Sequence, residues 1–174
     1  NKYDIVYLGN TQPLVTGGGG VTVKYKQVTL SAFFHGRFGQ SIVNMARMNN
    51  ESMYGSSNQS KAVLRRWKNE GDNTDIPRAL YNEGRNYLGS DRFVEKASFV
   101  RLKSMTLSYG FPRKICNRFN VNSLSVFVTG YNLFTWTNYT GQDPEVSTNS
   151  SNLAIDTATT PVAKRFSFGL NMSF

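Results

Sequence analysis

Apolar and polar residues alternate most regularly in the last segment of the chain. Every second residue there is apolar, namely Phe166, Phe168, Leu170, Met172 and Phe174, and serine, glycine or asparagine stands between them. Because alternate side chains of a β-strand point to opposite faces, this segment predicts a strand with one apolar and one polar face. Such a strand is typical of bacterial outer-membrane barrels, which need an apolar outer wall and a polar lumen.

Four further segments have a strand pattern: 21–25, 28–34, 98–111 and 124–133. Only Lys26 and Gln27 separate the first two, which predicts a hairpin, although this turn lacks the Gly or Asn of the common turn types. In the third segment the alternation breaks, because Arg101 and Lys103 share parity with Met105. A β-bulge, or a strand that projects above a membrane, explains the break.

Two long polar regions lie between the strand segments. Residues 37–96 and 135–161 are rich in loop signals, and 42–48 and 61–68 predict short helices within the first region. Residues 112–120 predict a short turn instead. An order of short turn, long loop, short turn and long loop is typical of outer-membrane barrels. We therefore expect the short turns and the C-terminus in the periplasm and the long loops outside the cell.

The fold class expected from these patterns is all-β, an antiparallel transmembrane barrel with long extracellular loops. The mean hydropathy is -0.41, and no apolar run approaches the roughly 20 residues of a transmembrane helix. Five strands do not close a barrel, since the smallest common barrels have eight strands and open edges are not tolerated in lipid. The 174 residues are therefore expected to be the last part of a larger barrel, unless three strands lack a recognisable pattern.

Charge and cysteine content exclude other classes of protein. The net charge is +9, but the basic residues form no dense stripe, so a nucleic-acid partner is not expected. A single cysteine, Cys116, excludes an internal disulfide and a Cys-only zinc site. No signal-peptide pattern follows Asn1, so we expect that a leader was removed or that the chain begins inside a longer polypeptide.

Residues for catalysis or metal binding are sparse. Gly17–Gly20 lacks the Lys and Ser/Thr of a phosphate loop and predicts a flexible start of a strand. His35 is the only histidine, which favours a lumen or rim position over a catalytic triad or metal site. The acidic loop residues are Asp72, Asp75, Asp91, Asp143 and Glu145. They match no EF-hand and fall in two separate loops, so solvation or local hydrogen bonds are favoured over calcium binding or a carboxylate pair. We expect no cofactor, no metal and no enzymatic activity.

Six blocks of sequence, in order, resemble a known family. They are Gly9-Asn-Thr-Gln-Pro13 with Thr16-Gly-Gly18; Phe33-Phe-His-Gly-Arg-Phe-Gly39; Trp67 with 71–78; 90–94 with 97–103; Val128-Thr-Gly-Tyr-Asn-Leu-Phe-Thr-Trp136 with Tyr139-Thr-Gly-Gln-Asp-Pro-Glu145; and 165–174. Nearly the whole chain thereby resembles the C-terminal region of SusC/RagA-like TonB-dependent outer-membrane transporters, which occur in Bacteroidota. The fifth block is the most specific of the six.

The resemblance implies a twenty-two-stranded barrel, of which residues 1–174 would supply about the last five strands. It implies that the plug domain and the earlier strands are absent from this chain, together with the segment that contacts the TonB complex. It also implies a SusD-like surface lipoprotein that covers the barrel as a lid. The function implied is import of bulky nutrients, glycans or peptides, across the outer membrane.

Two groups of residues have predicted roles in this reading. Phe166, Phe168, Leu170, Met172 and Phe174 are predicted to be the insertion signal that the barrel-assembly machinery recognises, since a strand with a free edge can bind by β-augmentation. Trp67, Arg78, Trp136 and Tyr139 are candidate contacts to substrate or to the lid lipoprotein. For the aromatic residues, packing within the loops or an interfacial girdle in outer-membrane lipid is favoured over stacking on sugar rings.

Three alternative functions explain parts of the pattern. A C-terminal barrel fragment bound as a client to the barrel-assembly machinery explains why no signal-peptide pattern follows Asn1. A soluble carbohydrate-binding β-sandwich explains the alternation, but not the outward rows of Val, Phe and Leu. An independent small barrel with lipid-modifying activity is the least supported, because no Ser/His/acid constellation is visible.

Overall fold

The chain folds into two compact units, each assembled from segments far apart in the sequence. The computed structural model describes residues 5–84, 87, 90–147 and 153–174. Unit 1 comprises Asn1–Gln12, Gly39–Ala97 and Tyr139–Thr160, and unit 2 comprises Pro13–Phe38, Ser98–Asn138 and Pro161–Phe174. Across the described residues, no helix is long and apolar enough to span a membrane.

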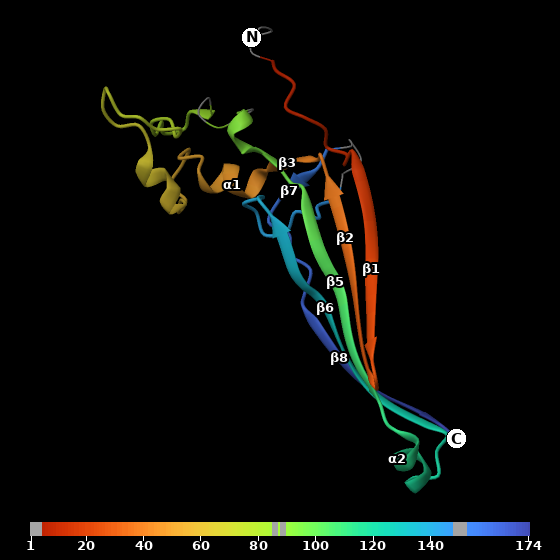
Figure 1. The fold of residues 1–174 in the computed structure, drawn as a ribbon. Coiled ribbons are helices and arrows are strands. Elements are labelled where there is room, and N and C mark those ends of the chain that lie inside the picture. The colour runs from red at the N-terminus through yellow and green to blue at the C-terminus, as the bar shows by residue number, and fades with distance from the viewer. Residues whose placement is uncertain (1–4, 85–86, 88–89, 148–152) are drawn as a thin grey trace. The chain divides into compact units, whose positions relative to one another are not determined.

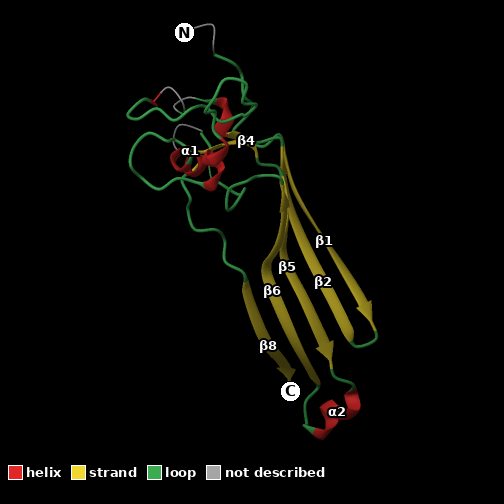
Figure 2. Cartoon of the chain, turned by 90° about the vertical axis from the view of Figure 1, so that its left-hand side faces the viewer, coloured by secondary structure: helices red, strands yellow, loops and turns green. Residues whose placement is uncertain are grey.

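Unit 2 is a five-stranded antiparallel sheet (Figures 1 and 2). In spatial order its strands are β1 (Val15–Tyr25), β2 (Val28–Phe38), β5 (Phe99–Gly110), β6 (Ser123–Thr137) and β8 (Arg165–Ser173). All five strands predicted from the alternation are therefore confirmed. The shortest, β8, has 9 residues and the longest, β6, has 15, and a tilted membrane strand needs about 9–11.

The register of the sheet collects the apolar residues on one side. Residues that pair directly across antiparallel strands share a face. Three rows cross all five strands in this way: Val21, Ala32, Met105, Gly130 and Phe166; Val23, Leu30, Leu107, Val128 and Phe168; and Tyr25, Val28, Tyr109, Val126 and Leu170. We call this side the wall face. On the opposite side, the Thr106 and Thr129 hydroxyls are hydrogen-bonded at 2.9 Å, so the sheet has one apolar and one polar face.

β1 begins at Val15 rather than at the predicted Val21, and the glycine run lies inside the strand. The four glycines pair in register with β2. Phe33 lies beside two of them, because a Cβ added to Gly18 or Gly20 would be 3.0 or 3.4 Å from its ring. The prediction of a flexible strand start was wrong, since backbone pairing and the Phe33 ring replace the side chains that glycine lacks.

The irregular alternation in β5 comes from a β-bulge, which is one of the two explanations that the sequence pattern left open. Leu102 and Ser104 pair with adjacent residues of β2, so Lys103 is the extra residue in this ladder, and the register with β6 shifts at the same point. The bulge places Arg101 on the polar face although it shares sequence parity with Met105 on the wall face.

Short connections join the strands at one end of the sheet. Lys26 and Gln27 link β1 to β2, and Lys26 has a φ of 52°, in the left-handed region that two-residue hairpin turns use. The second connection contains a short helix, α2 (Arg113–Arg118), where a plain turn was predicted. Buried Cys116 and Val121 anchor this helix. A helix of six residues is too short to show a periodic pattern in the sequence.

Unit 1 contains a small sheet and short helices in regions predicted to be loops. In spatial order its strands are β4 (Val94–Lys96), β3 (Ser41–Asn44) and β7 (Ile155–Asp156), and its helices are α1 (Met45–Asn50), η2 (Lys61–Arg65) and η4 (Asp91–Phe93). α1 and η2 overlap the two predicted helices. Parallel pairing of β3 with β7 joins the two polar regions, so the expectation of two separate loops was wrong. The sheet escaped prediction because strands of two to four residues show no alternation.

Candidate functional site

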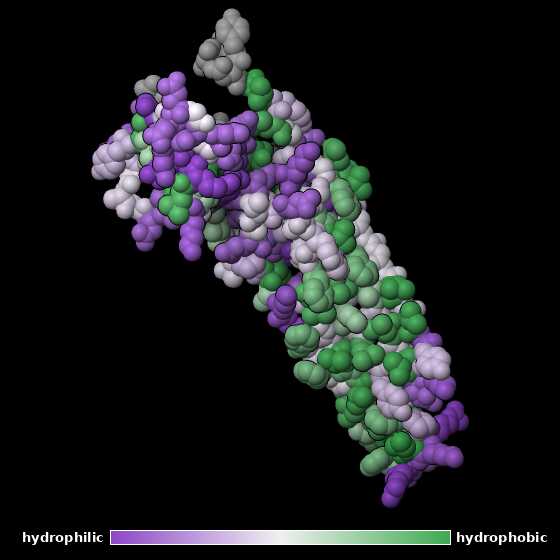
Figure 3. Space-filling view, turned by 60° about the vertical axis from the view of Figure 1, so that its left-hand side comes forward, coloured by the Kyte–Doolittle hydropathy of each residue, from purple (hydrophilic) through white to green (hydrophobic). Residues whose placement is uncertain are grey.

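The wall face of unit 2 exposes large apolar side chains along its whole length. Val23, Leu107 and Phe168 of the central row are 56, 46 and 80% exposed. Figure 3 shows hydrophobic side chains gathered over the strands of the sheet. Soluble monomers rarely expose contiguous apolar patches larger than a few hundred Å². A face of this kind is suited to hydrocarbon, and strands of this length are sufficient to cross it.

Aromatic contacts lie at both ends of the wall face. At the end with the short turns, the Tyr109 and Phe111 rings meet edge to face with centroids 5.2 Å apart. At the other end, the Trp136 ring lies 6.2 Å from Phe134 and 6.4 Å from Phe34. Membrane barrels carry aromatic girdles at both bilayer interfaces. The apolar rows thus lie between two aromatic groups, as expected for a transmembrane wall.

The two edge strands of the sheet, β1 and β8, each need a further strand as a hydrogen-bonding partner in a membrane. In the part of the chain that the structure describes, no further strand pairs with the outer side of either one. Open edges leave backbone N–H and C=O groups unpaired, which hydrocarbon does not tolerate. A transmembrane wall of this kind therefore needs additional strands at both edges.

The predicted insertion-signal residues lie together on β8. Phe166, Phe168, Leu170 and Met172 are on the wall face, and Phe174 follows the strand end with 83% of its surface exposed. On the polar face, the Phe127 ring covers Gly169 so closely that an added Cβ would overlap it. A side chain at position 169 would therefore displace the Phe127 ring. Recognition of these residues by the assembly machinery stays a prediction.

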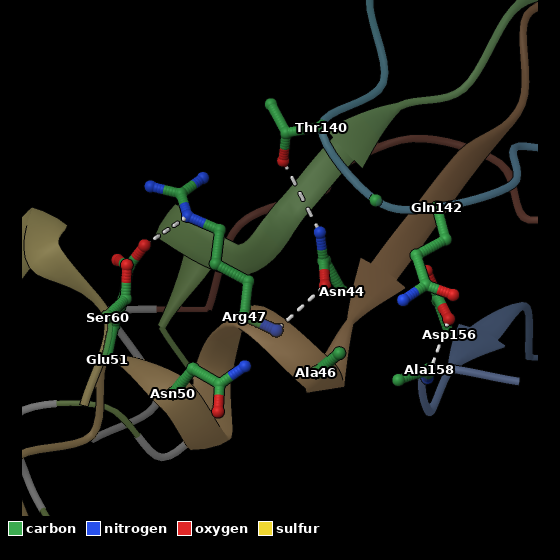
Figure 4. Close-up of a pocket in the computed structure, with 11 residues that line it drawn as sticks. Asn44, Ala46, Arg47, Asn50, Glu51, Ser60, Thr140, Gln142, Asp156 and Ala158 are labelled. Carbon is green, nitrogen blue, oxygen red and sulfur yellow. Dashed lines mark hydrogen bonds and ion pairs between the residues drawn. The ribbon is translucent and has the colours of Figure 1, made fainter. Parts of the chain in front are cut away.

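A second candidate site is a hollow of about 470 Å³ in unit 1 (Figure 4). Its lining is mainly polar and comes from both long polar regions of the sequence: Asn44, Arg47, Asn50, Glu51, Ser60, Thr140, Gln142 and Asp156, with Ala46, Gly141 and Ala158. The side chain of Asn44 accepts a hydrogen bond from the Arg47 backbone N–H at 2.9 Å and so caps α1. The capped helix forms one wall of the hollow.

Glu95 on β4 organises the charged groups beside this hollow. Its carboxylate accepts hydrogen bonds from Arg47 Nη1 at 3.1 Å, from Asn44 Nδ2 at 3.2 Å and from the Thr140 hydroxyl and backbone N–H at 2.8 and 3.0 Å. Burial alone raises the pKa of Glu95, but the hydrogen bonds from Thr140, Arg47 and Asn44 outweigh it and hold the pKa below its ordinary value. Ionised Glu95 therefore ties α1 to the segment that follows β6.

The other charged groups of this network form ion pairs with Glu51. Arg47 Nε is 2.9 Å from Glu51 Oε1, and Arg92 Nη2 is 3.4 Å from the second oxygen of the same carboxylate. Burial lowers the pKa of Arg92, whereas Glu51 and Glu95 outweigh burial at Arg47 and raise its pKa. The Tyr139 hydroxyl donates to Asp156 Oδ2 at 2.6 Å, and burial together with this carboxylate raises its pKa. The raised pKa keeps the Tyr139 hydroxyl protonated, so that it can donate to Asp156.

Two of the five acidic loop residues, Asp72 and Asp143, accept hydrogen bonds from nearby backbone N–H groups. Asp72 Oδ2 accepts from the backbone N–H groups of Lys68 and Asn69, both at 2.9 Å. Asp143 Oδ1 accepts from the backbone N–H of Glu145 at 2.9 Å. Among the residues whose positions are described, no group of three or more His, Cys, Asp and Glu could hold a metal ion.

The four candidate contact residues lie in different environments. Trp67 and Arg78 belong to unit 1, where the Trp67 backbone N–H donates to the Ile76 carbonyl. Trp136 is on β6 in unit 2, 54% exposed, and not in a loop. Tyr139 is buried and uses its hydroxyl on Asp156. The contacts of these four residues to substrate or lid stay predictions.

The network around Glu95 was missed at the level of sequence. Asn44 and Arg47 stand at the spacing of a helix cap, and Arg47 and Glu51 at the spacing of an i,i+4 ion pair, so part of it leaves a sequence signal. Glu95 and Thr140 are joined to it by pairing across 45 residues or more. No short-range pattern reports such a contact.

We expect the protection of unit 1 against hydrogen exchange to depend on Glu95. Because the folded pKa of Glu95 is lowered, its stabilising effect is complete above the unfolded pKa of about 4.5 and is lost as the pH falls through the folded pKa. In the full-length protein, Glu95→Gln is expected to raise exchange in peptides covering β3 and β7 on the order of tenfold at neutral pH. The substitution is also expected to abolish the pH dependence of this protection that arises from protonation of Glu95. Lys96→Gln, at an exposed neighbouring position, is the control. Equal protection in both variants would contradict this role.

Comparison with known proteins gives relatives for nearly the whole chain. It is 29% identical over 174 residues to TonB-dependent receptor P3 of Formosa agariphila. The match covers 96% of this chain and 17% of the relative. It is 29% identical over 177 residues to TonB-dependent receptor P26 of the same organism. This match covers 98% of this chain and 18% of the relative. The chain thus spans less than a fifth of the length of these relatives. No protein-family model matches it.

Solved structures give the same picture. The RagAB peptide transporter matches 94% of this chain at 27% identity with a TM-score of 0.80, over 17% of the solved chain. The RagAB peptide importer in its open-open state matches 94% at 26% identity with a TM-score of 0.77, again over 17% of the solved chain. These relatives are receptors and importers and not enzymes, in agreement with the prediction from the sequence.

Proposed function

The chain belongs to the SusC/RagA-like TonB-dependent outer-membrane transporters and corresponds to their C-terminal region, and on this premise we propose that the whole protein imports a bulky nutrient across the outer membrane. The nutrient is an oligopeptide or a glycan, and import is driven by a TonB complex. In this proposal the present chain supplies barrel wall, extracellular loops and the insertion signal, and it carries no chemistry of its own.

The wall face is the observation that carries the proposal. It supports a membrane-spanning sheet because three apolar rows cross five strands and remain exposed, while the hydroxyls lie on the other side. Its open edges favour a larger barrel. The resemblance to SusC/RagA-like transporters implies about twenty-two strands, of which unit 2 would supply the last five. The plug domain and the remaining strands would belong to the part of the protein outside this chain, consistent with its small share of the relatives' length.

The connections between strands support an orientation for the barrel. Two short connections, at Lys26–Gln27 and around α2, join the strands at one end, whereas the segments of unit 1 follow β2 and β6 at the opposite ends. Barrels of this type have short periplasmic turns and long extracellular loops. We therefore assign the short turns and β8's last residues to the periplasm and unit 1 to the cell exterior.

An extracellular unit 1 would face the partners of the transporter. A SusD-like surface lipoprotein is the proposed lid, by analogy with the RagAB complexes. Trp67 and Arg78 of unit 1 are the contact residues to test first, because Tyr139 is buried within the unit. The barrel-assembly machinery would act earlier, on β8.

Growth of a deletion strain tests the proposed function. Loss of the gene is expected to abolish growth on one class of nutrient, a defined oligopeptide mixture or a single glycan, supplied as the limiting source. A gene with an epitope tag inserted after Gly55 of unit 1, and one with the tag after Asn120 beside α2, are both expected to restore growth. Antibody is expected to label intact cells only for the first allele.

Two outcomes would contradict the proposal. Undiminished growth on every nutrient class at limiting concentration would argue against import. Labelling of intact cells at Asn120 and not at Gly55 would reverse the orientation. Membrane fractions from both strains, probed for the tag, serve as the control for expression.

A further inference from the structure

Acidic residues are absent from the sequence of unit 2. None of the 11 Asp and Glu residues of the chain falls in the segments that form this unit, whereas half of the 20 Lys and Arg residues do. At the end with the short turns, the basic residues are Lys24, Lys26, Arg113, Lys114 and Arg118. All five are exposed. This end of the sheet therefore carries a concentrated positive charge with no side-chain carboxylate to neutralise it.

The helix α2 presents these charges together with apolar side chains. Arg113, Lys114 and Arg118 are exposed on it, and beside them Ile115 is 38% and Phe119 65% exposed. Contacts with the adjoining backbone hold the helix in place. The buried thiol of Cys116 lies 3.6 Å from the Phe111 carbonyl, and the backbone N–H of Phe111 donates to the Leu124 carbonyl at 2.9 Å. A fixed helix that displays both cations and large apolar groups has the composition of an interfacial membrane helix.

At Lys26, this basic surface adjoins the wall face. Tyr25 and Tyr109 form part of the apolar row nearest to the short turns. Lys26 Nζ lies 5.3 Å from the centroid of the Tyr25 ring. Along the strands the order is therefore apolar rows, then aromatic rings, then cations. Figure 3 shows the same change from hydrophobic to hydrophilic side chains toward the lower tip, where Figure 1 labels α2.

We propose that α2 and the Lys26 turn form a docking surface for anionic phospholipid headgroups of the adjoining leaflet. Arg113, Lys114, Arg118 and Lys26 would bind lipid phosphates, while Ile115 and Phe119 enter the headgroup region. Guanidinium groups bind phosphate through paired N–H donors, and lysine adds a point charge. An acidic segment of a partner protein would match the charge, but it would leave two large apolar side chains beside the aromatic end of the wall without a function. The inference rests on the proposed membrane barrel and adds a lipid preference to it.

Lipid selectivity of the full-length protein tests the proposal. The protein is placed in phosphatidylcholine nanodiscs with and without phosphatidylglycerol, and native mass spectrometry counts the lipids it retains after release from the disc. The wild type is expected to retain phosphatidylglycerol over phosphatidylcholine on the order of tenfold, since each basic residue near an anionic surface adds to the attraction. The triple variant Arg113→Gln, Lys114→Gln, Arg118→Gln is expected to retain both lipids nearly equally.

A matched variant separates this surface from the overall charge. Lys61→Gln, Arg65→Gln, Lys68→Gln removes the same charge from exposed positions of unit 1 and is expected to keep the selectivity. Equal selectivity in the wild type and the α2 variant, or equal loss in both variants, would overturn the proposal. If the α2 variant does not fold, raised salt applied to the wild type decides the question, because selectivity that survives it is not electrostatic. A barrel that is folded and inserted but unselective contradicts this inference and leaves the proposed transport function intact.

Discussion

A single arginine in place of Leu107 is expected to cost the barrel about 2–4 kcal/mol and to lower its amount in the outer membrane several-fold. Leu107 lies in the central of the three wall-face rows, between Leu30 and Val128 on the neighbouring strands. At that depth the guanidinium would face the middle of the hydrocarbon, where snorkelling to an interface is longest. Urea unfolding of the full-length protein in lipid vesicles measures the stability change.

The adjacent residue provides the control. Ser108 is on the same strand, one residue away, and its side chain belongs to the polar face. Ser108→Arg introduces the same group at nearly the same depth, but on the lumen side, where a charge can stay hydrated. It is expected to change stability little. Equal costs for the two substitutions would mean that the wall face does not contact lipid.

The sheet of unit 2 could be predicted from the sequence because its physics is local. In a strand that contacts lipid on one side and water on the other, apolar and polar residues must alternate. The sequences of β8 and β2 show this alternation directly. Even the bulge at Lys103 left a signal, since it shifted the parity of Arg101. The glycines of β1 left none. Their strand is held by backbone pairing with β2 and by the ring of Phe33, neither of which a local pattern of side chains records.

Apart from its two short helices, unit 1 could not be predicted, for the opposite reason. Its strands are short, and its stability comes from contacts between residues distant in sequence, such as Gln40 with Pro144 and Glu95 with Thr140. The Gln40 side chain is buried and donates to two backbone carbonyls at 3.0 Å. Sequence reasoning interpreted the same residues as polar loops. A buried polar side chain and a solvated one look identical until the fold supplies the partner.

Removal of residues 166–174 is expected to have the largest effect of any change considered, with outer-membrane levels reduced on the order of tenfold or more. β8 pairs with β6 from Ser123↔Ser173 to Tyr131↔Arg165, so its loss exposes the edge of β6. Each backbone group left unsatisfied in hydrocarbon costs several kcal/mol. Quantitative immunoblots of separated membranes measure the level. Undiminished insertion of the truncated protein would refute both the structural and the signal role of β8.

Side-chain substitutions on β8 separate these two roles, because they preserve its backbone pairing. Changing Phe168 and Leu170 to Ser alters the wall face alone, and changing Ser167 and Asn171 to Ala alters the polar face alone. If the assembly machinery recognises the apolar row, the first variant is expected to accumulate outside the membrane while the second inserts normally. Both proteins are also refolded into lipid vesicles without the machinery. A first variant that refolds there but fails to insert in cells assigns the defect to recognition, whereas failure in both settings assigns it to the stability of the wall.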